Sequence, residues 1–258
     1  MAMSKDLVRK QFGEHAEAYA TSRVHAQGAS LTRLVELVEP QADWRILDVA
    51  TAAGHTAFVF APHVRHVVAS DLTPEMLRVA ARGAEERTIT NVSFELADAE
   101  DLPFDDGEFD LVTCRIAPHH FQHIDRFLSE SARVLREGGV LAVVDNVVPD
   151  GDAGDYVNRF EQIRDPSHHR ALALDEWVTA FTHAGFDVLQ TETARKRMDF
   201  QPWAERMGAS DEVIAELRQM LVAAPDEAAK YFCPDGKGAE LTFDLTEAIV
   251  VGRRLSNS

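Results

Sequence analysis

The sequence predicts an α/β fold in which a mostly parallel β-sheet carries helices on both faces. Short apolar runs that suit buried strands alternate along the chain with segments of helical periodicity. This alternation is typical of strand–helix–strand units, whose parallel strands are covered from both sides. The length of 258 residues and the hydrophobic content of 45% suit one domain, which we expect to span residues 1–258.

The first half of the chain supplies most of the expected elements. Residues 5–37 have helical spacing, and further helices are expected at residues 74–82 and 124–135. We interpret Gly138 and Gly139 as the C-cap of the last of these helices. The expected strands are residues 45–50, 64–69, 92–96, 109–113 and 140–144.

The second half of the chain is less regular. A helix is expected at residues 175–184, and strands are expected at 186–190 and 248–251. Residues 195–240 are rich in helical patterns and are predicted to form an insert between the last two strands, placed over the mouth of the sheet. Residues 5–38 are predicted to form an N-terminal helical cap.

Charge and composition narrow the classes of partner and compartment. The formal net charge of -17 repels phosphate backbones and anionic lipid surfaces, so we expect neither a nucleic acid nor a membrane as a partner. No apolar run is long enough to span a bilayer, and the first ten residues are too polar for a signal peptide. Two cysteines do not form a disulfide framework, so we expect a cytoplasmic protein.

The turn after the first expected strand carries the pattern of a nucleotide site. Asp48 lies in the strand, and small residues follow at alternate positions, Ala50, Ala52 and Gly54. Small residues let the backbone turn sharply and let a ligand approach the main chain. Alanine still permits a close approach of a ligand if its φ angle stays negative. Small residues at such a turn also serve plain packing, and this alternative stays open.

Two further acidic residues follow later strands. Asp71 ends the second strand, about twenty residues on, where a carboxylate accepts hydrogen bonds from ribose hydroxyls. The alternative is a charge that stabilises the N-terminus of the next helix. Asp98 follows the third strand and has the chemistry to accept a hydrogen bond from an adenine amine. Because strand ends meet at one edge of the sheet, these side chains are expected to share a crevice.

These segments together resemble a known family. The segments are Leu47-Asp48-Val49-Ala50, Asp71-Leu72-Thr73-Pro74-Glu75-Met76, residues 97–104, residues 109–112 and residues 134–139. Their order is similar to that of class I S-adenosylmethionine-dependent methyltransferases, within the ubiquinone/menaquinone-biosynthesis-like group. Residues 113–121 and 164–170 resemble motifs of bacterial small-molecule methyltransferases of unassigned substrate.

The resemblance implies a Rossmann-like seven-stranded sheet whose last strand is antiparallel. It also implies S-adenosylmethionine as cofactor and S-adenosylhomocysteine as product. The cofactor-binding residues that it implies are Asp48, Ala50, Ala52, Gly54, Asp71, Leu72, Met76, Asp98, Ala99 and Arg115.

Polar residues near the expected crevice are candidates for handling the acceptor. Methyl transfer is an in-line displacement, and a base is needed only when the acceptor must lose a proton. The candidate catalytic residues are His119, His120 and Asp145, and the candidate substrate-binding residues are Tyr19, Asn146, Arg164, His168 and His169. Packing, capping or ion-pairing roles remain the alternative for each. The histidine spacing does not match a metal site, so no metal is expected.

The predicted function is therefore methyl transfer to a small-molecule acceptor. One alternative is a nicotinamide-dependent oxidoreductase, which shares the acidic residue after the second strand but requires a strict glycine fingerprint. The other is a non-catalytic module that binds the cofactor. The sequence leaves the acceptor open, and it also leaves open whether the chain forms a homodimer.

Overall fold

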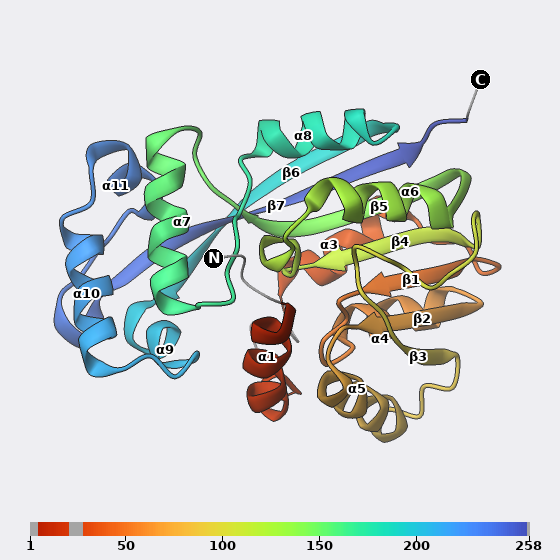
Figure 1. Cartoon of the computed structure of the whole chain (residues 1–258), viewed down its shortest axis with the longest axis horizontal. Coiled ribbons are helices and arrows are strands. Elements are labelled where there is room, and N and C mark those ends of the chain that lie inside the picture. The colour runs from red at the N-terminus through yellow and green to blue at the C-terminus, as the bar shows by residue number, and fades with distance from the viewer. Residues whose placement is uncertain (1–4, 21–27, 257–258) are drawn as a thin grey trace.

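The protein is built around a seven-stranded sheet in the order β3-β2-β1-β4-β5-β7-β6 (Figure 1). The computed structural model describes residues 5–20 and 28–256. The strands are β1 Arg45–Val49, β2 His66–Asp71, β3 Val92–Leu96, β4 Phe109–Arg115, β5 Leu135–Val147, β6 Phe186–Asp199 and β7 Thr242–Arg254. The first five strands pair in parallel, and β7 is antiparallel to both β5 and β6. The expected fold class is therefore confirmed, including the antiparallel last strand.

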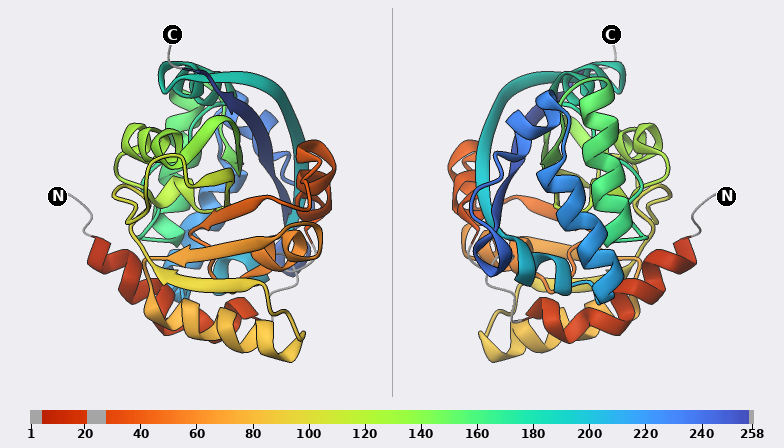
Figure 2. Two further views of the ribbon diagram at one scale, coloured as in Figure 1. Left: turned by 90° about the vertical axis from the view of Figure 1, so that its right-hand side faces the viewer. Right: turned by 90° about the vertical axis from the view of Figure 1, so that its left-hand side faces the viewer.

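Helices cover both faces of the sheet because its strands are apolar on both sides. The helices are α1 Lys5–Ala20, α3 Ala29–Val38, α4 His55–Phe60, α5 Pro74–Glu86, α6 Ile124–Val134, α7 Asp152–Arg164, α8 Leu174–His183, α9 Phe200–Glu205, α10 Asp211–Val222 and α11 Asp226–Phe232. Leu34 of α3 packs in one core cluster, and Phe127 of α6 with Trp177 of α8 packs in another. Figure 2 shows α3 and α6 on opposite sides of the sheet.

The N-terminal helices have two different roles in packing. The segment predicted as one helix forms α1 and α3, which belong to different parts of the molecule. Leu34 and Val38 of α3 are buried against the sheet, whereas α1 packs against α5. Within α1, Ala16 is buried in a small apolar cluster with Met76 and Val79 of α5.

The expected helix C-cap at Gly138 and Gly139 is wrong. The helix α6 ends at Val134, and both glycines lie inside the strand β5. Gly138 has a φ of +72°, and a Cβ on Gly139 would lie 2.9 Å from the carbonyl oxygen of Arg136. Gly138 therefore suits the positive φ and Gly139 the close approach of the β5 backbone to itself, next to the register shift in the pairing of β5 with β4.

A group of helices, α7, α9, α10 and α11, forms what we call the helical lobe (Figure 1). In the sequence, α9, α10 and α11 lie between β6 and β7. Residues 195–199, which were expected in the insert, belong to β6 instead. The lobe has its own apolar core, in which the rings of Phe160 and Trp203 stack at 5.0 Å. The lobe lies beside the ends of the long strands β6 and β7 rather than across the whole mouth of the sheet.

Tyr231 joins the helical lobe to the sheet. Its hydroxyl donates to the carbonyl oxygen of Val147 at 2.9 Å and accepts from the amide of Thr246 at 3.1 Å. The ring is 9% exposed, so neither backbone group has ready access to water in its place.

We expect Tyr231→Phe to lower the free energy of unfolding by about 1–3 kcal/mol, because two buried backbone groups lose their partner. Urea denaturation measures this change. Tyr156→Phe is the matched control, since the Tyr156 hydroxyl donates to the carbonyl oxygen of Met220 at 2.8 Å and is not placed between two backbone groups. An equal effect of the two substitutions would contradict the role assigned to Tyr231.

Candidate active site

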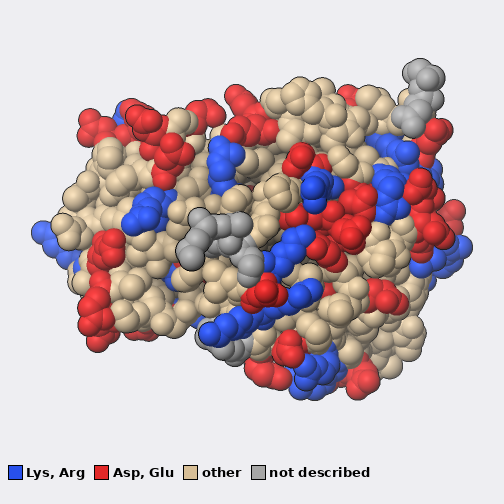
Figure 3. Space-filling view, in the orientation of Figure 1, with Lys and Arg blue, Asp and Glu red and all other residues tan. Residues whose placement is uncertain are grey.

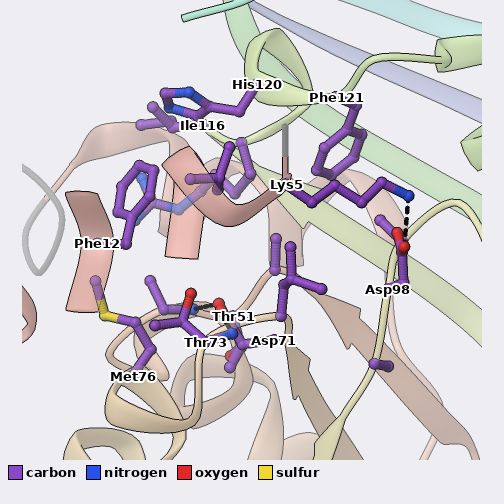
Figure 4. A pocket seen from close by; sticks show the side chains of 18 of the residues that line it. Lys5, Phe12, Thr51, Asp71, Thr73, Met76, Asp98, Ile116, His120 and Phe121 are labelled. Carbon is purple, nitrogen blue, oxygen red and sulfur yellow. Dashed lines mark hydrogen bonds and ion pairs between the residues drawn. The ribbon is translucent and has the colours of Figure 1, made fainter. Parts of the chain in front are cut away.

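A cavity lies where the carboxyl ends of β1, β2 and β4 meet, with α1 along one side (Figure 4). Its walls come from the loop after β1, the ends of β2 and β4, the segment after β3 and the turn around His120. Figure 4 shows Lys5 and Phe12 of α1 across the cavity from Asp71 and Met76. Segments that are distant in the sequence therefore form one enclosed site.

The loop after β1 has a backbone that alanine rarely adopts. Ala50 and Ala52 have φ angles of 52° and 48°, so neither alanine meets the condition of a negative angle. Left-handed backbone costs a non-glycine residue on the order of 1 kcal/mol, and it persists only where neighbours hold it. The amide of Ala52 donates to Asp71 Oδ2 at 2.9 Å, and the amide of Thr51 donates to the carbonyl oxygen of Ser70 at 2.9 Å. The end of β2 therefore fixes this loop.

Gly54 ends the same loop and begins α4. Its φ of +85° suits glycine, and a Cβ there would lie 2.5 Å from Cζ of Phe58. Gly54 does not line the cavity. Gly54 lets the chain turn into α4 against the Phe58 ring. Ala50 and Ala52, rather than Gly54, line the cavity.

Asp48 supports the loop from below. The residue is 1% exposed and does not line the cavity. Its Oδ2 accepts from the hydroxyl of Thr51 at 2.5 Å, and its Oδ1 accepts from the hydroxyl of Thr113 at 2.7 Å. Burial raises the pKa of Asp48 to about 6, although both hydroxyl bonds favour the charged form. A positive group placed nearby in the cavity would stabilise the carboxylate.

Asp71 faces the cavity from the end of β2. Its Oδ1 accepts from the amide of Thr73 at 2.8 Å and its Oδ2 from Ala52, so each oxygen keeps acceptor capacity for a ligand. Burial raises the pKa of Asp71 above its ordinary value, against the opposing effect of these backbone bonds. This geometry suits a pair of neighbouring hydroxyls.

The far end of the cavity is closed by an ion pair. Lys5 of α1 pairs with Asp98 and also with Glu100, whose Oε2 lies 3.0 Å from the lysine nitrogen. The amide of Glu100 donates to Asp98 Oδ1 at 3.0 Å, which holds that carboxylate toward the cavity. Lys5 and Phe12 were not among the predicted site residues, because helical spacing does not show where a helix packs.

The remaining cofactor candidates also line the cavity. Leu72, Met76 and Ala99 provide apolar walls between the carboxylates of Asp71 and Asp98. Arg115 ends β4, and its Nε donates to the hydroxyl of Thr56 at 3.3 Å. An apolar slot with a carboxylate at each end fits a flat base joined to a sugar, so the residues present fit an adenosyl group.

His120 lies on the cavity wall opposite these carboxylates. Its Nδ1 is 2.9 Å from the carbonyl oxygen of Ser167, which only accepts, so Nδ1 carries the proton and Nε2 is the acceptor. The ring of Phe12 meets it edge-on at 4.9 Å. Burial, followed by the nearby charge of His119, lowers the pKa of His120 to about 3. His120 is therefore neutral at pH 7.

His119 and Asp145 form a buried pair behind His120. The Nδ1 of His119 donates to Asp145 Oδ1 at 2.6 Å, which leaves Nε2 as the acceptor of the neutral ring. Burial lowers the pKa of His119, but the charge of Asp145 and its hydrogen bond outweigh burial and raise the pKa above the ordinary value. Asp145 lines neither this cavity nor the next, so it orients His119.

A second cavity adjoins the first and shares Ile116 and His120 with it. His119, Asn146 and Arg164 line this second cavity, together with Lys196, Trp203 and Arg206, which were not expected in the site. Their segments lie in β6 and the helical lobe, and only the folded chain brings them to the histidines.

The other acceptor candidates are placed differently. The Nε2 of His168 lies 2.9 Å from Asn158 Oδ1, and its ring stacks on His119 at 5.2 Å. His168 is therefore a buried residue that packs behind the site and lines neither cavity. His169 is exposed and lines neither cavity. Tyr19 lies in α1, but its side chain is outside the described residues.

Within the described ranges, no three His, Cys, Asp or Glu residues gather in a way that could hold a metal ion. None of the helices described is both long and apolar enough to cross a membrane.

The chain is similar to proteins named as methyltransferases. A family model described as a methyltransferase domain matches residues 46–139. The chain is 34% identical to the uncharacterized methyltransferase YcgJ of Bacillus subtilis over 93% of this chain and 96% of that protein. It is 38% identical to a demethylmenaquinone methyltransferase of Thermus thermophilus over 57% of this chain and 70% of that protein. The crystal structure of YcgJ matches with a TM-score of 0.85 at 33% identity, covering 88% of this chain and 99% of that chain.

The buried carboxyl of Asp48 makes stability depend on pH. Its pKa of about 6 in the folded protein lies above the unfolded value of about 4, so the fold prefers the protonated form. This contribution to stability is complete below pH 4 and is lost as the pH rises through 6. Asn keeps the shape without the charge, and the hydroxyls of Thr51 and Thr113 are able to rotate to bond it.

We expect Asp48→Asn to gain about 3 kcal/mol of unfolding free energy relative to the native protein between pH 4 and pH 7, without ligand. Urea denaturation at a series of pH values measures the difference. Asp187→Asn, on the exposed side of β6, controls for the substitution itself. A difference that does not grow with pH would show that Asp48 is not a strained buried carboxylate.

Proposed function

Because the chain belongs to the class I S-adenosylmethionine-dependent methyltransferases, we propose that it transfers a methyl group to a small-molecule acceptor by in-line displacement. The observation that carries the proposal is the first cavity, which has Asp71 and Asp98 at the ends of an apolar slot and His120 on the opposite wall. In this proposal Asp71 binds the ribose hydroxyls, Asp98 accepts from the adenine amine, and Leu72 and Met76 pack on the base.

The acceptor is proposed to occupy the second cavity. S-adenosylmethionine supplies an activated methyl on a sulfonium, so the protein's part is to position the acceptor and exclude water. The two cavities meet at Ile116 and His120, which sets the place where donor and acceptor would face each other. A small molecule is favoured over nucleic acid, because the net charge is -17 and acidic side chains form several patches on the face in Figure 3.

We propose different roles for the two histidines, His119 as a general base and His120 as a hydrogen-bond acceptor for the substrate. His119 is the stronger base of the two, because Asp145 raises its pKa and would stabilise the imidazolium. His120 stays neutral, and its Nε2 would accept a hydrogen bond that holds the acceptor group in line. Asp145 acts as a positioning residue through His119.

We expect Asp71→Asn to weaken binding of S-adenosylhomocysteine by about 2 kcal/mol, because the ribose hydroxyls lose a charged acceptor. Isothermal titration calorimetry measures the affinity. Asp110→Asn is the matched control, since Asp110 pairs with Arg136 near the start of β5 and lines neither cavity. Unchanged affinity would contradict the ribose assignment, and tighter binding of NAD than of S-adenosylhomocysteine would favour an oxidoreductase.

We expect His119→Gln to lower turnover about a hundredfold and to leave S-adenosylhomocysteine affinity unchanged, because a general base is lost. Transfer of radiolabelled methyl to an acceptor found by screening measures turnover. The exposed His183→Gln is the control for the same change of side chain. Full activity of the His119 variant would remove it from the mechanism, and cofactor binding without transfer to any acceptor would favour a binding module.

A further inference from the structure

The second cavity combines basic and apolar side chains in an acidic protein. Arg164 of α7, Lys196 of β6 and Arg206 after α9 all line it. Its other walls include Met198 and Trp203. In a chain with 43 acidic and 26 basic residues, three cationic side chains around one cavity are a local reversal of charge.

Arg164 is the most constrained of the three cations. Its guanidinium carbon lies 4.4 Å from the centre of the Trp203 ring, and its Nη2 bonds Glu161 Oε2 at 3.0 Å. Its Nε is buried without a hydrogen-bond partner among the described residues. A buried guanidinium nitrogen without an acceptor is costly, so an anionic oxygen beside it would be stabilising.

The acidic groups near the cavity already have partners. Lys196 pairs with Glu247, and Arg164 pairs with Glu161, but neither glutamate lines the cavity. Asp165 does line it, and its Oδ1 already accepts from the amide and the hydroxyl of Ser167, at 2.9 and 2.6 Å. Asp165 is therefore the one carboxylate among these three that lines the cavity, and the buried Nε of Arg164 keeps no hydrogen-bond partner among the described residues.

We propose that this cavity selects an acceptor that carries a carboxylate or phosphate group on an apolar body. The anionic group would bind among Arg164, Lys196 and Arg206, and the apolar body would lie along Met198 and Leu245. The nucleophile would then point toward His120, where the two cavities join. This inference rests on the proposed function and names the class of substrate for the same site.

A pair of probes of equal shape tests the proposal, 4-nitrobenzoate and its neutral amide, 4-nitrobenzamide. Calorimetric titration of the full chain, saturated with S-adenosylhomocysteine, should show at least tenfold tighter binding of the anion. Arg206→Gln should remove most of that preference. Lys196→Gln is a second variant in case the first does not fold, and circular dichroism checks both.

Arg170→Gln is the matched control, because Arg170 pairs with Glu176 on the surface and lines neither cavity. It should keep the full preference for the anion. Equal affinity for the two probes, binding of neither, or a preference that survives both Arg206→Gln and Lys196→Gln would overturn the proposal of an anionic acceptor. Failure to bind S-adenosylhomocysteine would instead overturn the proposed function, and titration of the probes without it would still decide the anion site.

Discussion

The site depends on two buried carboxylates that hold one strained loop. Asp48 bonds the hydroxyls of Thr51 and Thr113, and Asp71 bonds the amide of Ala52. These bonds tie the loop after β1 to β4 on one side and to β2 on the other. Without them the left-handed backbone at Ala52 has no evident compensation. The shape of the cavity thus follows from hydrogen bonds at the ends of adjacent parallel strands.

The same carboxylates carry an electrostatic cost that ligand binding would offset. Burial raises the pKa of both Asp48 and Asp71, so the protein without ligand stores unfavourable charge beside its cavity. A ligand that donates hydroxyl hydrogen bonds and carries a positive group would stabilise these carboxylates, and this stabilisation would contribute to its affinity. On the other side of the site, Arg164 and its neighbours present the opposite sign. The methyl donor and the methyl acceptor would therefore bind to regions of opposite charge.

Much of the fold was predictable, because short apolar runs such as residues 46–47 and 140–144 are typical of strands that are buried on both faces of a parallel sheet. The length of β6 was not, since its charged and mostly exposed residues leave no apolar run. Cofactor candidates at strand ends follow from topology, and eight of the ten line the first cavity. Lys5, Trp203 and Arg206 reach the site through the packing of separate helices, which no local pattern encodes.

Two kinds of interaction hold α1 in place, and they respond differently to salt. Its Lys5 end is held by ion pairs in which the lysine side chain is 34% exposed, and mobile ions screen exposed charges over about 8 Å at physiological ionic strength. Its Ala16 end is held by apolar contact with α5, which salts do not screen. A rise in ionic strength therefore weakens the contact at Lys5, which closes the far end of the cavity, more than the contact at Ala16.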